Sequence, residues 1–242
     1  MKDQVRKMMN WTAVLLLPAL LFSSCDEAGY SSSDCPASEQ RTFSVSGFTR
    51  VDAGENFRLQ IQPGETFSLA AEGCTRELDE LELDVHNGEL EIRYNRNRNN
   101  RRRVDITITM PALDGFNISG AAEAQVLRFG AHDEFHATVS GAAEASFSGD
   151  MGQLAVDLSG TAKLKLNGTA DNLEAQLSGN PRLEAYGLPA KEVAIEASGA
   201  GKAWVLVSES LRVDASGSCH IYYKGSPSTD IQLSGASEVV HE

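Results

Sequence analysis

Apolar and polar positions alternate along the second half of the chain in seven similar units. Each unit is centred on a Ser-Gly pair, and apolar residues stand one and three positions before the serine and five and seven positions after it, with His241 as the exception. The positions two before and four after the serine are polar in every unit. Alternation with a period of two predicts strands with one buried and one exposed face. The pairs are Ser119-Gly120, Ser140-Gly141, Ser159-Gly160, Ser178-Gly179, Ser198-Gly199, Ser216-Gly217 and Ser234-Gly235.

A repeat of about 20 residues with no helix between the strands indicates a solenoid, in which each unit buries its apolar face only by stacking on the next. We therefore expect an all-β fold, a parallel β-helix (β-solenoid) with about 20 residues per coil. An antiparallel β-sandwich built from hairpins is the alternative, but like residues recur in each column, which favours stacking. The glycine of each pair has the inward parity of its neighbours, so we expect it at a narrow interior corner where Gly160→Leu would overpack.

The N-terminal residues have the features of an exported protein. Lys2, Arg6 and Lys7 precede a short apolar run, so residues 1–24 are predicted to be a signal peptide. The run ends in Leu-Phe-Ser-Ser-Cys, which resembles a bacterial lipobox, so we expect Cys25 to be acylated and residues 25–40 to form a lipidated N-terminus and flexible tether. An ordinary signal peptide with an incidental cysteine is the alternative. The acidic pair after Cys25 resembles surface-export signals as well as inner-membrane retention signals, which leaves the membrane leaflet open.

The charge and the cysteine and histidine content indicate which partners, disulfides and metal sites to expect. Without residues 1–24, 18 Lys and Arg face 33 Asp and Glu, a net charge of −15 (21 − 3 against 34 − 1). So acidic a protein is not expected to bind nucleic acid. Cys35 and Cys74 could form a disulfide, and Cys219 is expected to be a buried free thiol. The five histidines are scattered, so no metal site and no cofactor are expected.

Residues 41–115 are strand-rich but less regular, and they carry a series of short motifs in a specific order. These are Phe43…Val51, Gly54-Glu55-Asn56-Phe57-Arg58-Leu59, Val85 to Ile92, Met110-Pro111-Ala112-Leu113 and Phe116 to Ala121. With the Ser-Gly repeats, they make the chain resemble the family described as "putative auto-transporter adhesin, head GIN domain". The resemblance covers about residues 41–240. By the regularity of the strands, we expect residues 41–115 to form its N-terminal β-rich part and residues 116–242 to form the Ser-Gly repeat β-helix. The resemblance implies a β-helical protein of the cell surface or periplasm and carries over no catalytic residues.

An arginine-rich segment lies between two alternating strands and is expected to be a long hairpin tip. Six guanidinium groups could bind phosphates, sulfates or uronates, whereas a solvated tip that protects a sheet edge is the alternative. The arginines are Arg93, Arg96, Arg98, Arg101, Arg102 and Arg103.

Trp204 and Tyr222 each lie six residues after a serine, on the outward parity of adjacent coils. Stacked coils would place the two rings side by side as a platform for a sugar ring, with Lys202, His220 and Glu184 around them. A structural cross-strand pair or a dimer contact is the alternative.

The sequence does not support catalysis. Asp157, Glu196 and Asp214 share one outward column, but Gln176 interrupts it, and acid–base chemistry needs carboxylates paired at a defined separation. The serine column is expected to be structural. We therefore expect a non-enzymatic outer-membrane lipoprotein of the cell envelope, periplasmic or surface-exposed, that serves adhesion, scaffolding or binding of a glycan or protein partner. A polysaccharide-active enzyme is the alternative, and the oligomeric state is left open.

Overall fold

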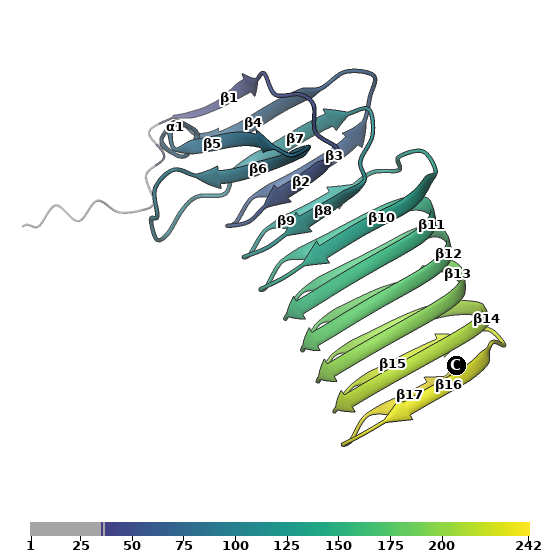
Figure 1. Cartoon of the computed structure of the whole chain (residues 1–242). Coiled ribbons are helices and arrows are strands. Elements are labelled where there is room, and N and C mark those ends of the chain that lie inside the picture. The colour runs from purple at the N-terminus through teal and green to yellow at the C-terminus, as the bar shows by residue number, and fades with distance from the viewer. Residues whose placement is uncertain (1–34, 36) are drawn as a thin grey trace, which may run out of the picture. The chain divides into compact units, whose positions relative to one another are not determined.

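The computed structural model of the chain describes residue 35 and residues 37–242, and residues 35–242 form one compact unit. This unit is a rod of stacked coils with a broader N-terminal end (Figure 1). The predicted signal peptide, Cys25 and most of the tether lie outside the described residues. Among the described residues, no helix is long and apolar enough to cross a membrane.

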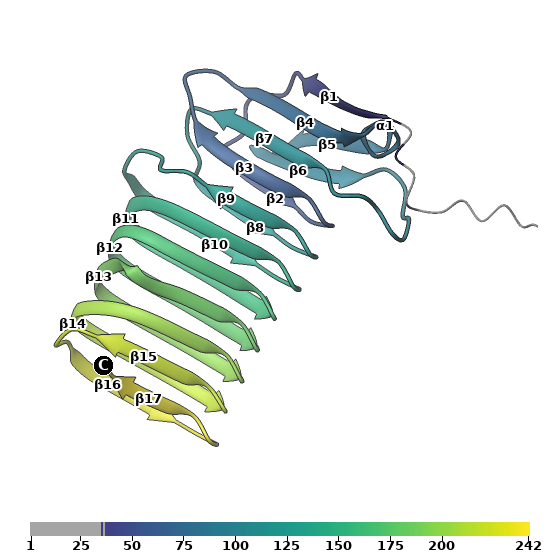
Figure 2. The same ribbon diagram turned by 180° about the vertical axis from the view of Figure 1, so that it is seen from behind.

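The seven repeats fold as predicted into parallel stacked coils, so the β-solenoid is confirmed and the β-sandwich is wrong. Each long strand bends at a corner, so its first half lies in one sheet and its second half lies in a second sheet that faces the first. The bends and the stacked coils can be followed from behind in Figure 2. Successive repeats pair in register, Leu164 with Leu183 and Ser178 with Ser198. The strands are β8 (Gly115–Ile118), β9 (Glu123–Val126), β10 (His132–Val139), β11 (Glu144–Gly160), β12 (Lys163–Gly179), β13 (Arg182–Gly199), β14 (Lys202–Gly217), β15 (His220–Lys224), β16 (Ser228–Leu233) and β17 (Glu238–His241).

The core fills the space between the two sheets with the predicted apolar columns. In the first six repeats these side chains are at most 7% exposed, apart from the partly exposed Tyr223; Leu158 and Leu164 are 2% and 1% exposed. Burial of these columns is the main driving force for stacking. In the last described coil, Ile231 and Leu233 occupy the same columns but are 39% and 44% exposed, since a neighbouring coil covers them on one side only.

The Ser-Gly corner differs from the prediction. The seven glycines are exposed at the outside of the corner, and all have a positive φ, between 68° and 100°. A Cβ on Gly160 would come within 2.6 Å of the carbonyl oxygen of Gly141 in the coil before. The prediction of an inward glycine is wrong, because a left-handed residue ends the alternation of strand parity. Glycine is needed here for its left-handed backbone and for the close approach of successive coils.

A ladder of backbone hydrogen bonds joins these corners. From the second repeat onward, the N–H after each glycine donates to the glycine carbonyl one coil earlier, for example from Thr161 to Gly141 at 2.7 Å and from Ala200 to Gly179 at 2.6 Å. In the first six repeats the residue two beyond the glycine is buried, for example Ala143 and Cys219, both 0% exposed. Cys219 is the free thiol that the sequence predicted.

The solenoid begins before the Ser-Gly repeats. β2 (Arg50–Ala53) and β3 (Arg58–Pro63) pair in parallel with β8 and β9, and β6 (Glu89–Tyr94) and β7 (Asp105–Met110) stack on the other side of β2 and β3. Chain order and spatial order therefore differ in this part. Glu55, with φ 59°, takes the place of the corner glycine, and its carbonyl accepts a hydrogen bond from Ala121 at 2.6 Å.

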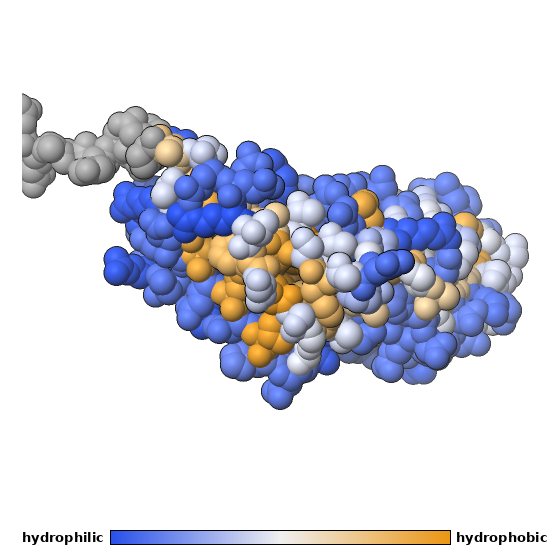
Figure 3. Space-filling model, turned by 90° about the horizontal axis from the view of Figure 1, so that it is seen from above, coloured by the Kyte–Doolittle hydropathy of each residue, from blue (hydrophilic) through white to orange (hydrophobic). Residues whose placement is uncertain are grey.

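Antiparallel strands broaden the N-terminal end. β1 (Ser38–Phe43) pairs with β4 (Ser68–Cys74), β4 pairs with β7, and β5 (Leu81–His86) pairs with β6; α1 (Thr75–Asp79) links β4 to β5. A disulfide joins Cys35 to Cys74, with 5.6 Å between their Cα atoms. Seen from above, this end shows apolar atoms between hydrophilic rims (Figure 3). Partly buried side chains that pack against the core here include Phe43, Phe67 and Leu83.

Candidate functional site

The most distinctive surface lies on the outer face of one sheet, formed by β3, β9, the first halves of β11 to β14, and β15 and β17. Two columns of side chains point outward on it. The first runs Glu144, Lys163, Arg182, Lys202, His220 and Glu238, and the second runs Ser146, Lys165, Glu184, Trp204, Tyr222 and Val240, each residue opposite the next in register.

Trp204 and Tyr222 are adjacent and partly exposed, as predicted. Their ring centroids lie 5.2 Å apart and the ring planes differ by 9°, which is an offset stack. The guanidinium group of Arg182 lies 4.2 Å from the centroid of the Trp204 ring. Arg182 comes from the coil before Trp204 and Tyr222 from the coil after it, so the indole lies between them.

This geometry differs from the expected platform. The two rings overlap instead of lying edge to edge, and both faces of the indole have a protein neighbour. The ring edges therefore make up the exposed aromatic surface, since Val240 lies opposite Tyr222 on the next coil. Sequence parity placed the rings in one column correctly, but it could not give their tilt or the position of Arg182.

The polar residues predicted beside the rings also lie on this face. Lys202 is opposite His220 in register, and Glu184 accepts a hydrogen bond at 2.5 Å from Arg182. The Nδ1 atom of His220 is buried and has no hydrogen-bond partner among the described residues. We call these five residues, Trp204, Tyr222, Lys202, His220 and Glu184, the aromatic face.

Two hollows adjoin on the same sheet next to the aromatic face. One, of about 490 Å³, follows the first column and is lined by Lys163, Arg182 and Glu144 among others. The other, of about 320 Å³, is lined by Tyr186, Trp204 and Arg182 among others. They share the lining residues Lys165, Arg182 and Glu184, so together they form a depression of two adjoining parts, the second of which borders the indole. We call it the face hollow.

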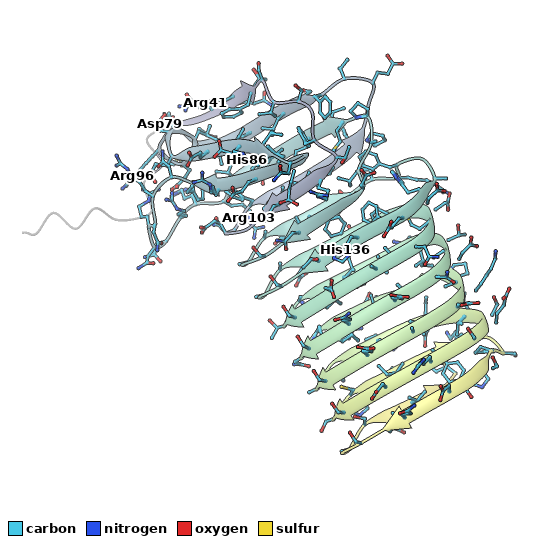
Figure 4. All side chains as sticks on the ribbon, viewed as in Figure 1. Arg41, Asp79, His86, Arg96, Arg103 and His136 are labelled. Atoms are coloured by element: carbon cyan, nitrogen blue, oxygen red, sulfur yellow. A yellow bond between two sulfur atoms is a disulfide. The ribbon has the colours of Figure 1, made fainter. Side chains whose placement is uncertain are left out.

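The arginine-rich segment is not a hairpin tip, and that prediction is wrong. It runs from β6 to β7, which do not pair with each other but with β2 and β3. Figure 4 shows Arg96 and Arg103 on this connection at the N-terminal end. Alternating strands on both sides suggested a hairpin, but the chain instead crosses between the two sheets.

Most of these arginines are paired with carboxylates. Arg93 binds Glu82 and Asp84 at 2.7 Å, and Arg103 binds Glu123 at 2.8 Å. These contacts offer a structural role for guanidinium groups that the sequence singled out as a candidate anion site. The sequence could not reveal it, since Glu82, Asp84 and Glu123 are distant in the chain.

Arg101 forms the most buried of these pairs. Its side chain is 4% exposed, donates to Glu77 at 3.1 Å and Glu80 at 2.8 Å, and lies 3.7 Å from the centroid of the Tyr94 ring. Arg98 binds Glu77 at 2.5 Å. Burial raises the pKa of Glu80, but the hydrogen bond from Arg101 and the charge of Arg98 outweigh it, so the pKa lies below its usual value. The network fixes the connection to α1.

Carboxylates gather on the outer face of the other sheet. Asp157, Glu196 and Asp214 line a hollow of about 420 Å³, and Gln176 interrupts them as the sequence indicated. The Nε2 atom of His136, which is labelled in Figure 4, lies 3.0 Å from the Oδ2 atom of Asp157. Within residues 37–242, no cluster of three or more His, Cys, Asp or Glu side chains is arranged to hold a metal ion.

These features define a β-solenoid protein with a ribbed polar surface. The family model described as "putative auto-transporter adhesin, head GIN domain" matches residues 47–227, and the chain belongs to this family. Membership fits a non-catalytic β-helical protein of the cell surface or envelope.

Solved structures share the fold. A "putative adhesin" from Bacteroides fragilis NCTC 9343 is 22% identical with a TM-score of 0.75. A "putative lipid binding protein" from Parabacteroides distasonis ATCC 8503 and a "putative adhesin" from Parabacteroides merdae ATCC 43184 are each 15% identical, with TM-scores of 0.69 and 0.68. In all three cases the match covers 85% of this chain and 96% of the other. At these identities the likeness shows the fold alone. No curated protein matches the chain at a significant level.

Proposed function

We propose that this chain is a lipid-anchored, non-catalytic protein of the bacterial cell envelope that binds a glycan through its aromatic face and serves adhesion. The observation that carries the proposal is the stacked pair Trp204 and Tyr222, which lies at the surface beside the face hollow. Aromatic side chains next to convergent polar groups are typical of sites that hold a ligand with apolar faces and many hydroxyl groups.

The neighbours of the rings suit a sugar. Lys202 and His220 supply N–H donors for hydroxyl or carboxylate oxygens, and the carboxylate of Glu184 accepts hydrogen bonds from hydroxyl groups. Because Arg182 and Tyr222 cover the faces of the indole, the sugar packs against the edges of the two rings. The face hollow beside the rings provides room for more than one sugar unit of a chain.

The interior of the rod is filled by side chains, which favours a binding site on the outer surface. One structural relative is described as a "putative lipid binding protein", but the coils of this chain are filled by their own side chains. Phe135 and Phe147, for example, are fully buried and stack at 4.4 Å between centroids. We therefore place the ligand on the surface. An acyl anchor at Cys25 would hold the rod at a membrane.

Binding of the chain from residue 26 onward to a glycan array tests the proposal. Trp204→Ala should weaken the binding of a recognised glycan by about 1–3 kcal/mol, a range taken from base–aromatic stacking, with little change in thermal unfolding. His241→Ala is the matched control, since it removes one member of another stacked pair, Tyr223 and His241 at 4.7 Å, outside the aromatic face.

Two results would contradict the proposal. One is the absence of binding to every glycan on the array. The other is a Trp204→Ala variant that binds as the wild type does but unfolds at a lower temperature or changes its oligomeric state. That outcome would make the stacked pair a structural or dimer contact.

A further inference from the structure

Three basic residues and a histidine lie directly opposite one another on four successive coils of the aromatic sheet. Lys163 pairs in register with Arg182, Arg182 with Lys202, and Lys202 with His220. We call these four residues the cationic column. Neighbouring strands are about 4.8 Å apart, and like charges placed directly opposite on a sheet are destabilising. Such an arrangement runs against folding stability, which is typical of a functional surface.

The column is unusual in this acidic protein. The chain from residue 25 onward has a net charge of −15 (18 against 33), whereas the face hollow and Lys202 beside it bring together five cations and three carboxylates. The cations are Arg58, Lys163, Lys165, Arg182 and Lys202, and the carboxylates are Glu123, Glu144 and Glu184. The protein therefore concentrates positive charge on one stretch of one face.

The positive charge of the column is only partly neutralised. Lys163 binds Glu144 at 2.5 Å, and Arg182 binds Glu184 at 2.5 Å. Within residues 37–242, Lys165 and Lys202 form no ion pair. The part of the column nearest the rings thus retains free capacity for an anion.

We infer that the cationic column binds an acidic polysaccharide, a sugar chain with carboxylate or sulfate groups, which lies along the rod axis in the face hollow. This inference rests on the proposed function and specifies its ligand. The coil spacing of about 4.8 Å is close to the length of one sugar unit, so successive charged sugars meet successive basic residues. Lys163, Arg182 and Lys202 donate charge-assisted hydrogen bonds to the anionic groups, while the rings contact the sugar carbons.

Other basic residues fit this role less well. Of the arginines on the connection from β6 to β7, Arg93, Arg98, Arg101 and Arg103 pair with carboxylates. The outer face of the other sheet carries the acidic residues Asp157, Glu196 and Asp214 and would repel a polyanion. The geometry therefore assigns one face to the ligand.

The test compares polygalacturonate, heparin, neutral dextran and duplex DNA as immobilised ligands for the chain from residue 26 onward, which contains the whole described fold. We expect binding to polygalacturonate or heparin that weakens at least tenfold between 50 and 300 mM NaCl, because screening shortens the range of the attraction (~14 to ~6 Å). The variant Lys163→Gln/Lys202→Gln should lose at least about tenfold in affinity, because it removes two charged donors to the anionic groups of the ligand.

Two controls separate local from general effects. Lys191→Gln/Arg212→Gln removes the same net charge from surface positions outside the aromatic face and should bind as the wild type does. The variant of the cationic column should unfold at a temperature no lower than the wild type, because it relieves repulsion between stacked charges. Its loss of binding then reflects the site and not the fold.

The outcomes are distinct for the two proposals. Salt-independent binding to neutral glycans that is lost in Trp204→Ala keeps the proposed function and overturns the acidic ligand. No binding to any glycan overturns both. Equal losses in the two double variants, or equally tight binding to duplex DNA, show a general charge effect and overturn the assignment of the column to a polysaccharide.

Discussion

Substitution of Gly160 tests what holds the stacked corners together. Gly160 has φ +73°, and a Cβ added there would lie 2.6 Å from the carbonyl oxygen of Gly141 and 3.2 Å from its Cα. A left-handed backbone costs a non-glycine residue about 1–2 kcal/mol. The contact also pushes the two coils apart at the hydrogen bond from Thr161 to Gly141, and a weakened bond costs about 0.5–1.5 kcal/mol. Gly160→Ala should therefore cost about 1.5–3.5 kcal/mol.

Two other glycines separate these causes. Gly47 has φ +79° but nothing within 4 Å of its Cβ position, so Gly47→Ala carries the backbone cost alone, about 1–2 kcal/mol. Gly130 has neither feature, and Gly130→Ala should stay within about 0.5 kcal/mol of the wild type. Thermal unfolding followed by far-ultraviolet circular dichroism measures the series. For a domain of this size, 1.5–3.5 kcal/mol lowers the midpoint by about 3–14 °C.

The same series distinguishes the exposed corner from an interior corner. Because Gly160 is exposed, Gly160→Leu should cost about as much as Gly160→Ala. A Leu variant several kcal/mol less stable than the Ala variant would show that the side chain points into the core. Equal stability of Gly160→Ala and Gly130→Ala would refute the reasoning altogether.

Three further predictions follow from the anchor and the buried ion pairs. Cys25→Ala should move the protein from the membrane fraction to the soluble fraction, and unchanged membrane association with an intact N-terminus would contradict acylation. Arg101→Ala should lower the free energy of unfolding by about 3–5 kcal/mol, because Glu80 and Glu77 lose a partner in a buried site. Urea denaturation measures this loss, and a loss below about 0.5 kcal/mol would contradict the prediction. The pKa of Glu80 is lowered in the folded protein, so its ionised carboxylate stabilises the fold at pH values above its unfolded pKa of about 4.3. This stabilisation is lost as the pH falls through the folded pKa. The difference in free energy of unfolding between the wild type and Glu80→Gln should therefore shrink from pH 6 to pH 3.

The repeating half of the fold could be predicted because its information is local. Each strand shows its buried face within a few residues, and the Ser-Gly spacing sets the length of the coil. The corner itself was misjudged, since strand parity cannot be carried through a left-handed residue such as Gly160. The glycine does indicate a bend, but the bend requires glycine for its left-handed backbone and not for a narrow interior.

The N-terminal part was less predictable because its contacts are distant in the chain. Nothing near Glu55 shows that it replaces a corner glycine, and the pairing of β2 with both β6 and β8 depends on the assembled rod. The candidate site shows the same limit. The column of Trp204 and Tyr222 followed from the repeat, whereas the position of Arg182 over the indole depends on rotamers that no spacing encodes.

Fluorescence of Trp204 tests the central claim most directly. The chain has two tryptophans, Trp11 and Trp204, so the chain from residue 26 onward reports on Trp204 alone. Titration with the glycan that binds best should change its emission saturably, with the dissociation constant found for the immobilised ligand, and Lys163→Gln/Lys202→Gln should shift the curve to higher concentration. Binding that leaves the emission of Trp204 unchanged at saturation would contradict a ligand on the aromatic face.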